Sequence, residues 1–328
     1  MKKLLIPVVA IFMLLLVGCE DSDTNTATTE QQLLALLDGD DIFGLDGLDD
    51  GEAIEGDYES GLELPGTYKT LGDTIDPDSG LRIRFGRRIT SVAREVEFRD
   101  TDADTAYATI TRVVNGNFVI FTRDTASGDT SRWIKPFTTD FIRQVRFVRV
   151  ADSDTLDWKI DALTVGVGIT GTKVNIARVD WFTADGTTVL FSYGGDVINQ
   201  FFSRDEIAAF TAWETLRVEV TVTNQGPEFP FNSGEGVLLH YGSGPGVKGR
   251  KAINDSGRSG DAVASDNIFT GYWRVHGPGW DNRQGRWYQH RAFRSFVDVI
   301  DFGSLYAEDE AIHSVFWALP YRSMRPDA

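Results

Sequence analysis

The C-terminal half of the chain alternates apolar and polar positions in short segments, which predicts β-strands. In the clearest case, Leu216, Val218, Val220 and Val222 alternate with polar or charged residues. A period of two places these side chains on one face of a half-buried strand. Because short strands separated by Gly- and Asp-rich turns are typical of sandwiches, we predict an all-β sandwich over 171–328. Its other strands are expected at 187–193, 237–241, 268–275, 293–300 and 312–319.

A similar pattern, less regular, runs through the preceding part of the chain. Asn115-Gly116 lies between the strand-like segments 106–114 and 117–122. This dipeptide strongly favours the tight turn of a β-hairpin, so we expect one here. Further strands are expected at 92–98, 141–150 and 158–167. The Gly-rich run Gly166–Gly171 then indicates a boundary between two folding units near 168–174.

The first 18 residues have the layout of a secretory signal peptide. A basic start is followed by the apolar run Leu4–Val17, which is shorter than the roughly 20 residues that a membrane-spanning helix needs. Leu16-Val17-Gly18-Cys19 resembles a bacterial lipobox, which implies that Cys19 is acylated, for example with palmitate. Several acyl chains hold a protein on a membrane more firmly than one. The alternative is an ordinary signal peptide with an incidental cysteine.

The anchor predicts a location in the bacterial cell envelope. Cys19 is the only cysteine of the chain, so the mature protein has no free thiol, disulfide or thiolate metal site once this residue is acylated. In lipoproteins of bacteria with two membranes, Asp after the acylated cysteine tends to retain the protein at the inner membrane. This chain has Glu20 at that position, which favours the outer membrane.

Acidic residues are concentrated directly after the signal peptide. The chain has a formal net charge of −17, and residues 20–68 contain 15 Asp and Glu but no Lys or Arg. The remainder is close to neutral, so the acidity belongs mainly to this segment. An acidic chain repels phosphate backbones, so we do not expect a nucleic-acid partner. Residues 19–32 have little to bury and are expected to form a flexible acidic tether.

Three segments in the middle of the chain, DTAYATITRVVNG, RQVRFVRV and DWKIDALTV, resemble the NTF2-like (SnoaL or ketosteroid-isomerase-like) superfamily. The resemblance implies that residues 33–170 form an α+β cone, in which N-terminal helices cover a curved sheet around a pocket. Enzymes of this superfamily usually place an Asp or His base in the cone. Residues 82–168 contain no His. We therefore expect a role other than catalysis, with an enzyme or a carrier of small apolar ligands as the alternative.

The segment from Asn254 to Gly271 resembles a turn of immunoglobulin-like modules in bacterial surface proteins. It carries Asp255, Asp261 and Asp266 among glycines and serines. Their carboxylates predict a tight turn in which they accept hydrogen bonds from backbone N–H groups. The alternative is a Ca²⁺ site, because Ca²⁺ prefers oxygen ligands; no other cofactor is expected.

Aromatic residues interleaved with arginines mark the segment 272–293. Trp280 and Asn282, with Trp287, are candidates for a loop that binds a sugar or a partner protein, because Trp280 falls in a Gly-Pro-Gly loop. The alternative is that the aromatic residues fill the sandwich core while the arginines reach solvent. The leading hypothesis is thus a cell-envelope lipoprotein that acts as a non-enzymatic binding or scaffolding module. A glycan-binding surface lipoprotein is a further alternative.

Overall fold

The computed structural model describes residues 23–39, 81–99, 102, 104–124, 126–150, 158–226, 234–242, 248–281, 286–307 and 310–326. Of these residues about 63% are in strands and 9% in helices, so the described part of the protein is all-β. The elements in chain order are α1 (Asp23–Gly39), β1 (Leu81–Arg99), β2 (Thr105–Asp124), β3 (Thr130–Arg149), β4 (Trp158–Leu163), β5 (Gly166–Thr170), β6 (Val174–Thr183), β7 (Val189–Gly194), β8 (Phe202–Ser203), η2 (Arg204–Glu206), β9 (Ala209–Thr211), β10 (Thr215–Asn224), β11 (Glu235–Gly242), β12 (Lys248–Ile253), β13 (Ile268–Arg274), β14 (Trp280–Asp281), β15 (Arg286–Trp287), β16 (His290–Asp301), α2 (Phe302–Tyr306), β17 (Ser314–Ala318) and β18 (Tyr321–Met324).

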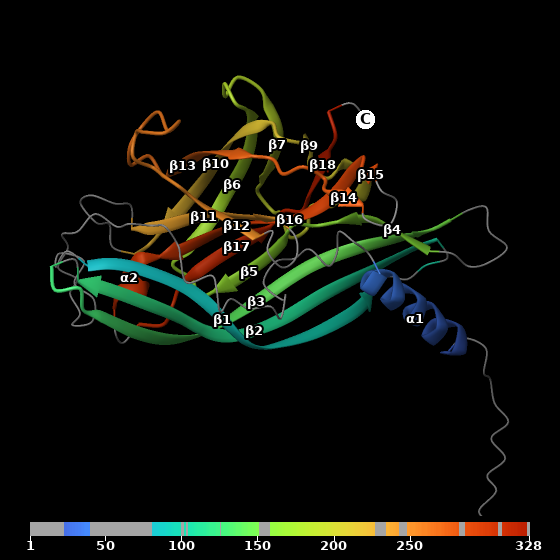
Figure 1. Ribbon diagram of the computed structural model, residues 1–328. Coiled ribbons are helices and arrows are strands. Elements are labelled where there is room, and N and C mark those ends of the chain that lie inside the picture. The colour runs from blue at the N-terminus through green and yellow to red at the C-terminus, as the bar shows by residue number, and fades with distance from the viewer. Residues whose placement is uncertain are drawn as a thin grey trace, which may run out of the picture.

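Two main sheets contain most of the described strands. The larger has the order β1-β2-β3-β5-β17-β16-β11-β12, with β4, β8, β9 and β18 joined to it. The smaller has the order β13-β10-β6-β7. In Figure 1 the long strands β1–β3 form a curved ribbon along one side of the molecule, and the remaining strands form the sandwich beside it.

The middle layer of the molecule is buried on both faces. In β16, Val297 and Val299 belong to the core that is shared with the four-stranded sheet. The alternate residue Ile300 instead packs with Phe85 and Phe118 of the ribbon. Successive side chains point to opposite faces of a strand, so the central strands contact the four-stranded sheet on one face and the ribbon on the other. The ribbon and the central strands belong to one hydrogen-bonded sheet, which bends where β3 pairs with β5 so that its two parts pack against each other. The result is three layers: the ribbon, the central strands and the four-stranded sheet.

Helix α1 covers the part of the ribbon that extends beyond the central strands. Leu33 and Leu37 are buried against Ala108, Val145 and Phe147 of the ribbon. The apolar patch of the sequence at 33–37 therefore forms a helix. Residues 23–32, which were expected to form a flexible tether, lie in the same helix. A helix that is fixed by packing at one end extends at little cost, because each added residue gains a hydrogen bond.

The predicted α+β NTF2-like cone over 33–170 is wrong. Where the cone should enclose a pocket beneath several helices, the inner face of the ribbon packs on the central strands and on α1. The rings of Phe141 and Phe316, which stack with centroids 5.9 Å apart, fill part of the space between the ribbon and the central strands. The sandwich predicted for 171–328 agrees with the all-β structure, but its larger sheet continues into the ribbon.

The predicted hairpin at Asn115-Gly116 is also wrong, because both residues lie inside the single strand β2. Asn115 pairs with Ser91 and Gly116 with Ile89, and the register of β1 shifts at this point. A Cβ at Gly116 would lie 2.5 Å from the carbonyl oxygen of Arg88 and 2.7 Å from the ring of Phe137. The glycine therefore allows a close approach between strands instead of a turn.

The Gly-rich run that predicted a domain boundary forms most of β5. This strand pairs with β3 on one side and with β17 on the other, so the hydrogen-bonded sheet is continuous through residue 170. Among the described residues, no helix has both the length and the apolar character needed to span a membrane.

Candidate functional site

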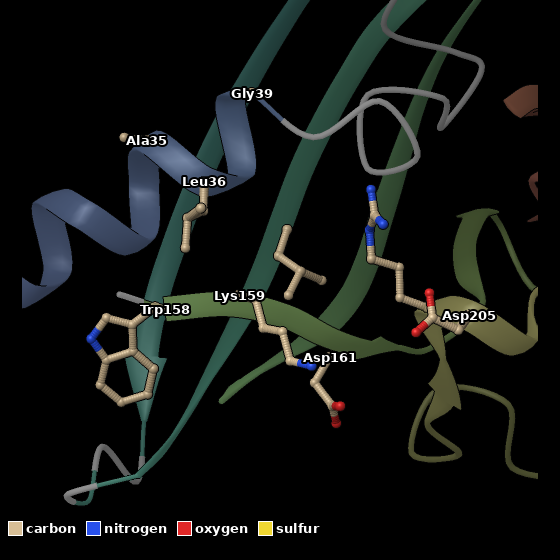
Figure 2. A pocket seen from close by; sticks show the side chains of 9 residues that line it. Ala35, Leu36, Gly39, Trp158, Lys159, Asp161 and Asp205 are labelled. Atoms are coloured by element: carbon tan, nitrogen blue, oxygen red, sulfur yellow. The ribbon is translucent and has the colours of Figure 1, made fainter. Parts of the chain in front are cut away.

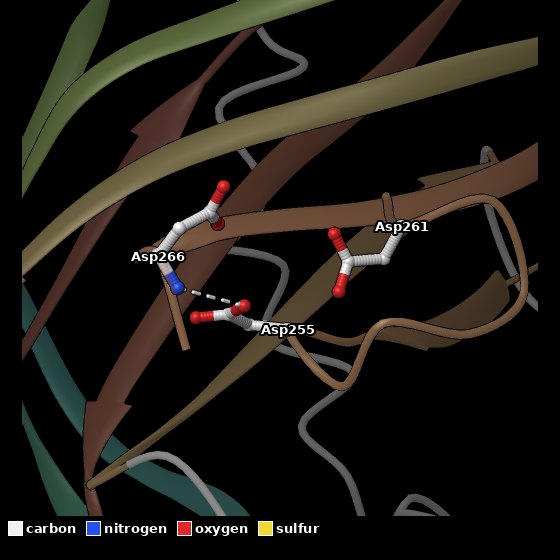
Figure 3. Close-up of side chains that lie close together, drawn as sticks. All are labelled: Asp255, Asp261 and Asp266. Carbon is white, nitrogen blue, oxygen red and sulfur yellow. Dashed lines mark hydrogen bonds between the residues drawn. The ribbon is translucent and has the colours of Figure 1, made fainter. Parts of the chain in front are cut away.

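The three predicted carboxylates lie together in the turn before β13, as Figure 3 shows. One carboxylate oxygen of each of Asp255, Asp261 and Asp266 lies within 4.8 Å of those of the other two. Asp255 and Asp261 are buried, whereas Asp266 is exposed. The backbone supports this arrangement, since Asn267 adopts φ +63°, a left-handed conformation that Asn accepts more readily than most residues.

Each carboxylate accepts hydrogen bonds from the backbone of the turn. The Asp255 oxygens accept from the N–H groups of Asp266 (3.2 Å) and Asn267 (2.8 Å). Asp261 Oδ2 accepts from the Gly257 N–H at 2.5 Å, and Asp266 Oδ1 from the Ile268 N–H at 3.0 Å. These contacts are the ones expected of a structural turn, and the same oxygens have the chemistry of Ca²⁺ ligands.

Burial dominates the electrostatics of this turn. It raises the pKa of the Asp255 carboxyl above its ordinary value, and the negative charge of Asp266 acts in the same direction. The N–H donors of Asn267, Asp266 and Ser265 oppose the rise but do not cancel it. A carboxylate whose charge is disfavoured by burial and by a neighbouring charge is stabilised by further donors or by a cation.

We predict that Asp261→Ala destabilises the protein even when EDTA is present. Loss of a buried charge-assisted hydrogen bond to the Gly257 N–H should cost about 1.5–3 kcal/mol, measured by urea unfolding. The exposed Asp266→Ala is the matched control and should cost less. If Ca²⁺ raises the melting temperature, and Asp261→Ala removes that rise while leaving the melting temperature in EDTA unchanged, the turn is a metal site.

The predicted aromatic loop is only partly within the described residues. Trp280 and Trp287 pair across the two short strands β14 and β15, which places their backbones opposite each other. Asn282 lies outside the described residues. The structure thus brings the two tryptophan positions together, and the proposed role of this loop in binding stays a prediction.

The sequence did not predict a pocket of about 420 Å³ between α1 and β4. Figure 2 shows Leu36 on the α1 side and Lys159 and Asp161 on β4. The lining combines these charged residues with apolar ones such as Trp158. Asp161 accepts a hydrogen bond from Arg146 Nε at 2.8 Å, so its charge already has a partner. The helix is distant from β4 in sequence, which is why no local pattern marks this pocket.

A buried ion pair, Arg87–Asp298, lies between the ribbon and the central strands. The Arg87 guanidinium of β1 binds both carboxylate oxygens of Asp298 in β16, with Nη2 2.8 Å from Oδ1, and also donates to Ser314 Oγ at 3.0 Å. The Arg87 side chain is 6% exposed and Asp298 is 0% exposed. Burial alone would raise the pKa of Asp298, but the nearby Arg87 charge and His240 lower it to about 2.

The His240 ring lies beside this pair. Its Nε2 is 3.7 Å from Asp298 Oδ2, too far for a normal hydrogen bond, and its ring stacks on Phe296 with centroids 4.1 Å apart. Burial lowers the pKa of His240. Arg87 binds both oxygens of Asp298, so this ion pair joins two layers of the fold. Asp298 is therefore not available as a free catalytic base.

No protein-family model and no curated protein sequence matches this chain. Cys19 and the predicted signal peptide lie outside the described residues.

Proposed function

We propose that this chain is a lipid-anchored protein of the bacterial cell envelope and that its β-rich body is a non-enzymatic binding or scaffolding module. The observation that carries the proposal is Leu16-Val17-Gly18-Cys19, placed directly after the basic start and apolar run of a signal peptide. The lone cysteine stands at the position that acylation requires. Glu20 favours the outer membrane as the site of the anchor.

The short distance from the anchor to the folded body supports a defined orientation. Helix α1 begins at Asp23, four residues after Cys19, which is at most about 14 Å of chain. The α1 end of the molecule, with the pocket beside β4, would therefore lie nearest the membrane. The opposite end of the ribbon and much of the sandwich would face away and be accessible to partners.

Replacing Cys19 by Ser should release the protein from the membrane fraction and abolish incorporation of labelled palmitate. The matched control is Ser22→Ala, which leaves the cysteine in place and should fractionate like the unaltered protein. Density separation of inner and outer membranes measures the location of the anchor in the same experiment. If Cys19→Ser stays membrane-bound and still incorporates palmitate, the proposed anchor is wrong.

Two described features favour a binding module over an enzyme. The buried Asp298 is held by Arg87 and the His240 ring stacks on Phe296, and neither residue lines the pocket between α1 and β4. The alternative of an NTF2-like enzyme or carrier depended on a cone that the fold does not contain. The glycan-binding alternative keeps a specific basis in two exposed aromatic side chains, Trp213 and Tyr288, which are 45% and 39% exposed.

A further inference from the structure

Trp213 combines two unusual properties in the turn between β9 and β10. Its side chain is 45% exposed, although large aromatic residues usually bury most of their surface. Its backbone has φ +68°, a left-handed conformation that is a genuine outlier for a bulky residue. Such strain persists only where the surrounding structure imposes it, and it is concentrated at functional sites.

The surrounding contacts hold this tryptophan rigidly. Its backbone N–H donates to the Val275 carbonyl at 3.0 Å, and its own carbonyl accepts from Arg274 Nε at 3.1 Å. The indole lies directly on Gly277, where an added Cβ would come within 2.8 Å of Cζ2. Ser323 Oγ in turn donates to the carbonyl of His276 at 2.5 Å, which fixes the chain beneath the ring. An exposed ring that is already fixed loses little entropy on binding.

A second residue with an exposed aromatic side chain is bound through its backbone to the segment on which the indole lies. Tyr288 is 39% exposed, and its N–H donates to the Gly279 carbonyl at 3.1 Å. Gly277, on which the Trp213 indole lies, and Gly279, which binds the Tyr288 backbone, are separated by at most about 7 Å of chain. Arg291 stacks over the Tyr288 ring, with Cζ 5.8 Å from the centroid. A guanidinium therefore stacks on the Tyr288 ring, and a second one, that of Arg274, binds the backbone of Trp213.

We propose that Trp213, with Arg274 and Tyr288, forms a carbohydrate-binding platform at this end of the sandwich. The apolar C–H face of a pyranose ring stacks on a flat indole, and its hydroxyl groups accept hydrogen bonds from guanidinium N–H donors. Arg274 uses Nε to bind the Trp213 carbonyl, and within the part of the chain that the structure describes no hydrogen bond or ion pair engages its two terminal amino groups. This assignment deepens the binding role proposed above by naming a ligand class, but it does not depend on Cys19.

The test measures binding of chitotetraose, cellotetraose and maltotetraose to the full chain in detergent, by isothermal titration and saturation-transfer NMR. We expect at least one of these sugars to bind, and Trp213→Ala to weaken it about tenfold. Gly277→Ala should weaken binding as well, because it displaces the indole while leaving it in the protein. Ile134→Ala, which alters an exposed apolar residue of the ribbon, is the matched control and should leave binding unchanged.

Trp213→Gly distinguishes a functional residue from a structural one. Glycine adopts φ +68° without strain, so this variant should melt at a higher temperature than the unaltered protein while losing the sugar. Cys19→Ser should bind the sugar normally, so failure of the anchor and failure of the platform are separable. The proposal is overturned if the unaltered protein binds none of the three sugars up to their solubility limits, or if Trp213→Ala and Ile134→Ala bind them equally well.

Discussion

Replacing Asp298 by alanine should lower the free energy of unfolding by about 3–5 kcal/mol, because the Arg87 charge would remain buried without its partner. The guanidinium cannot lose its proton to escape this cost. It lies over the Phe118 ring, with Cζ 4.6 Å from the centroid, and among the described residues its amino groups otherwise donate only to Ser314 Oγ. Urea unfolding monitored by circular dichroism measures the loss.

The matched control for this change is Asp161→Ala. Asp161 also pairs with an arginine, Arg146, through one carboxylate oxygen, but the two side chains are 27% and 36% exposed. Solvent screens such a pair, so its removal should cost less than about 1 kcal/mol. Equal losses for the two variants would show that burial does not determine the strength of the Arg87–Asp298 contact. The double variant Arg87→Met/Asp298→Leu should recover most of the stability, because it removes both charges.

The same carboxyl should make the protein sensitive to acid. Its pKa is about 2 in the folded protein and about 3.9 in an unfolded chain. A lowered folded-state pKa contributes stability that is complete above the unfolded value and is lost as the pH falls through the folded value. Unfolding free energies measured between pH 5 and pH 2 should therefore fall in the unaltered protein more steeply than in the Arg87→Met/Asp298→Leu variant.

Alternation along the sequence predicted the strands that have one buried and one more polar face. Strand β10 is the clearest case, since Leu216, Val218, Val220 and Val222 are all buried as expected. The central strands β16 and β17 were also recognisable, but their burial on both faces was not. That burial comes from the ribbon, which is distant in sequence and packs on residues such as Phe296 and Ile300.

The wrong predictions arose where a local signal was overridden by a distant contact. Asn115-Gly116 favours a turn in isolation, but Asn115 accepts from Thr138 Oγ1 at 2.8 Å across the sheet and Gly116 makes room for Phe137. The carboxylate turn was predictable because its contacts are local in sequence. The pocket beside α1 and the strained Trp213 depend on tertiary packing, so residue patterns gave no signal for them.

Replacing Gly168 by valine should be among the most damaging single changes, with a loss of about 3 kcal/mol or failure to fold. Gly168 pairs with Phe316 of β17 and with Phe141 of β3. A Cβ at this position would lie 1.8 Å from Phe316 Cε1 and 2.2 Å from Cζ. The run that suggested a boundary between folding units is therefore glycine-rich because it must leave space for aromatic rings.

Two further variants of this strand test the steric explanation. Ile169→Ala, at the neighbouring residue that is 42% exposed, should cost much less in urea unfolding. Phe316→Ala removes buried apolar contacts and is destabilising on its own. In the Gly168→Val background, however, it also removes the clash, so the double variant should be more stable than the sum of the single losses predicts. Strict additivity would show that the Phe316 ring is not what excludes a side chain from position 168.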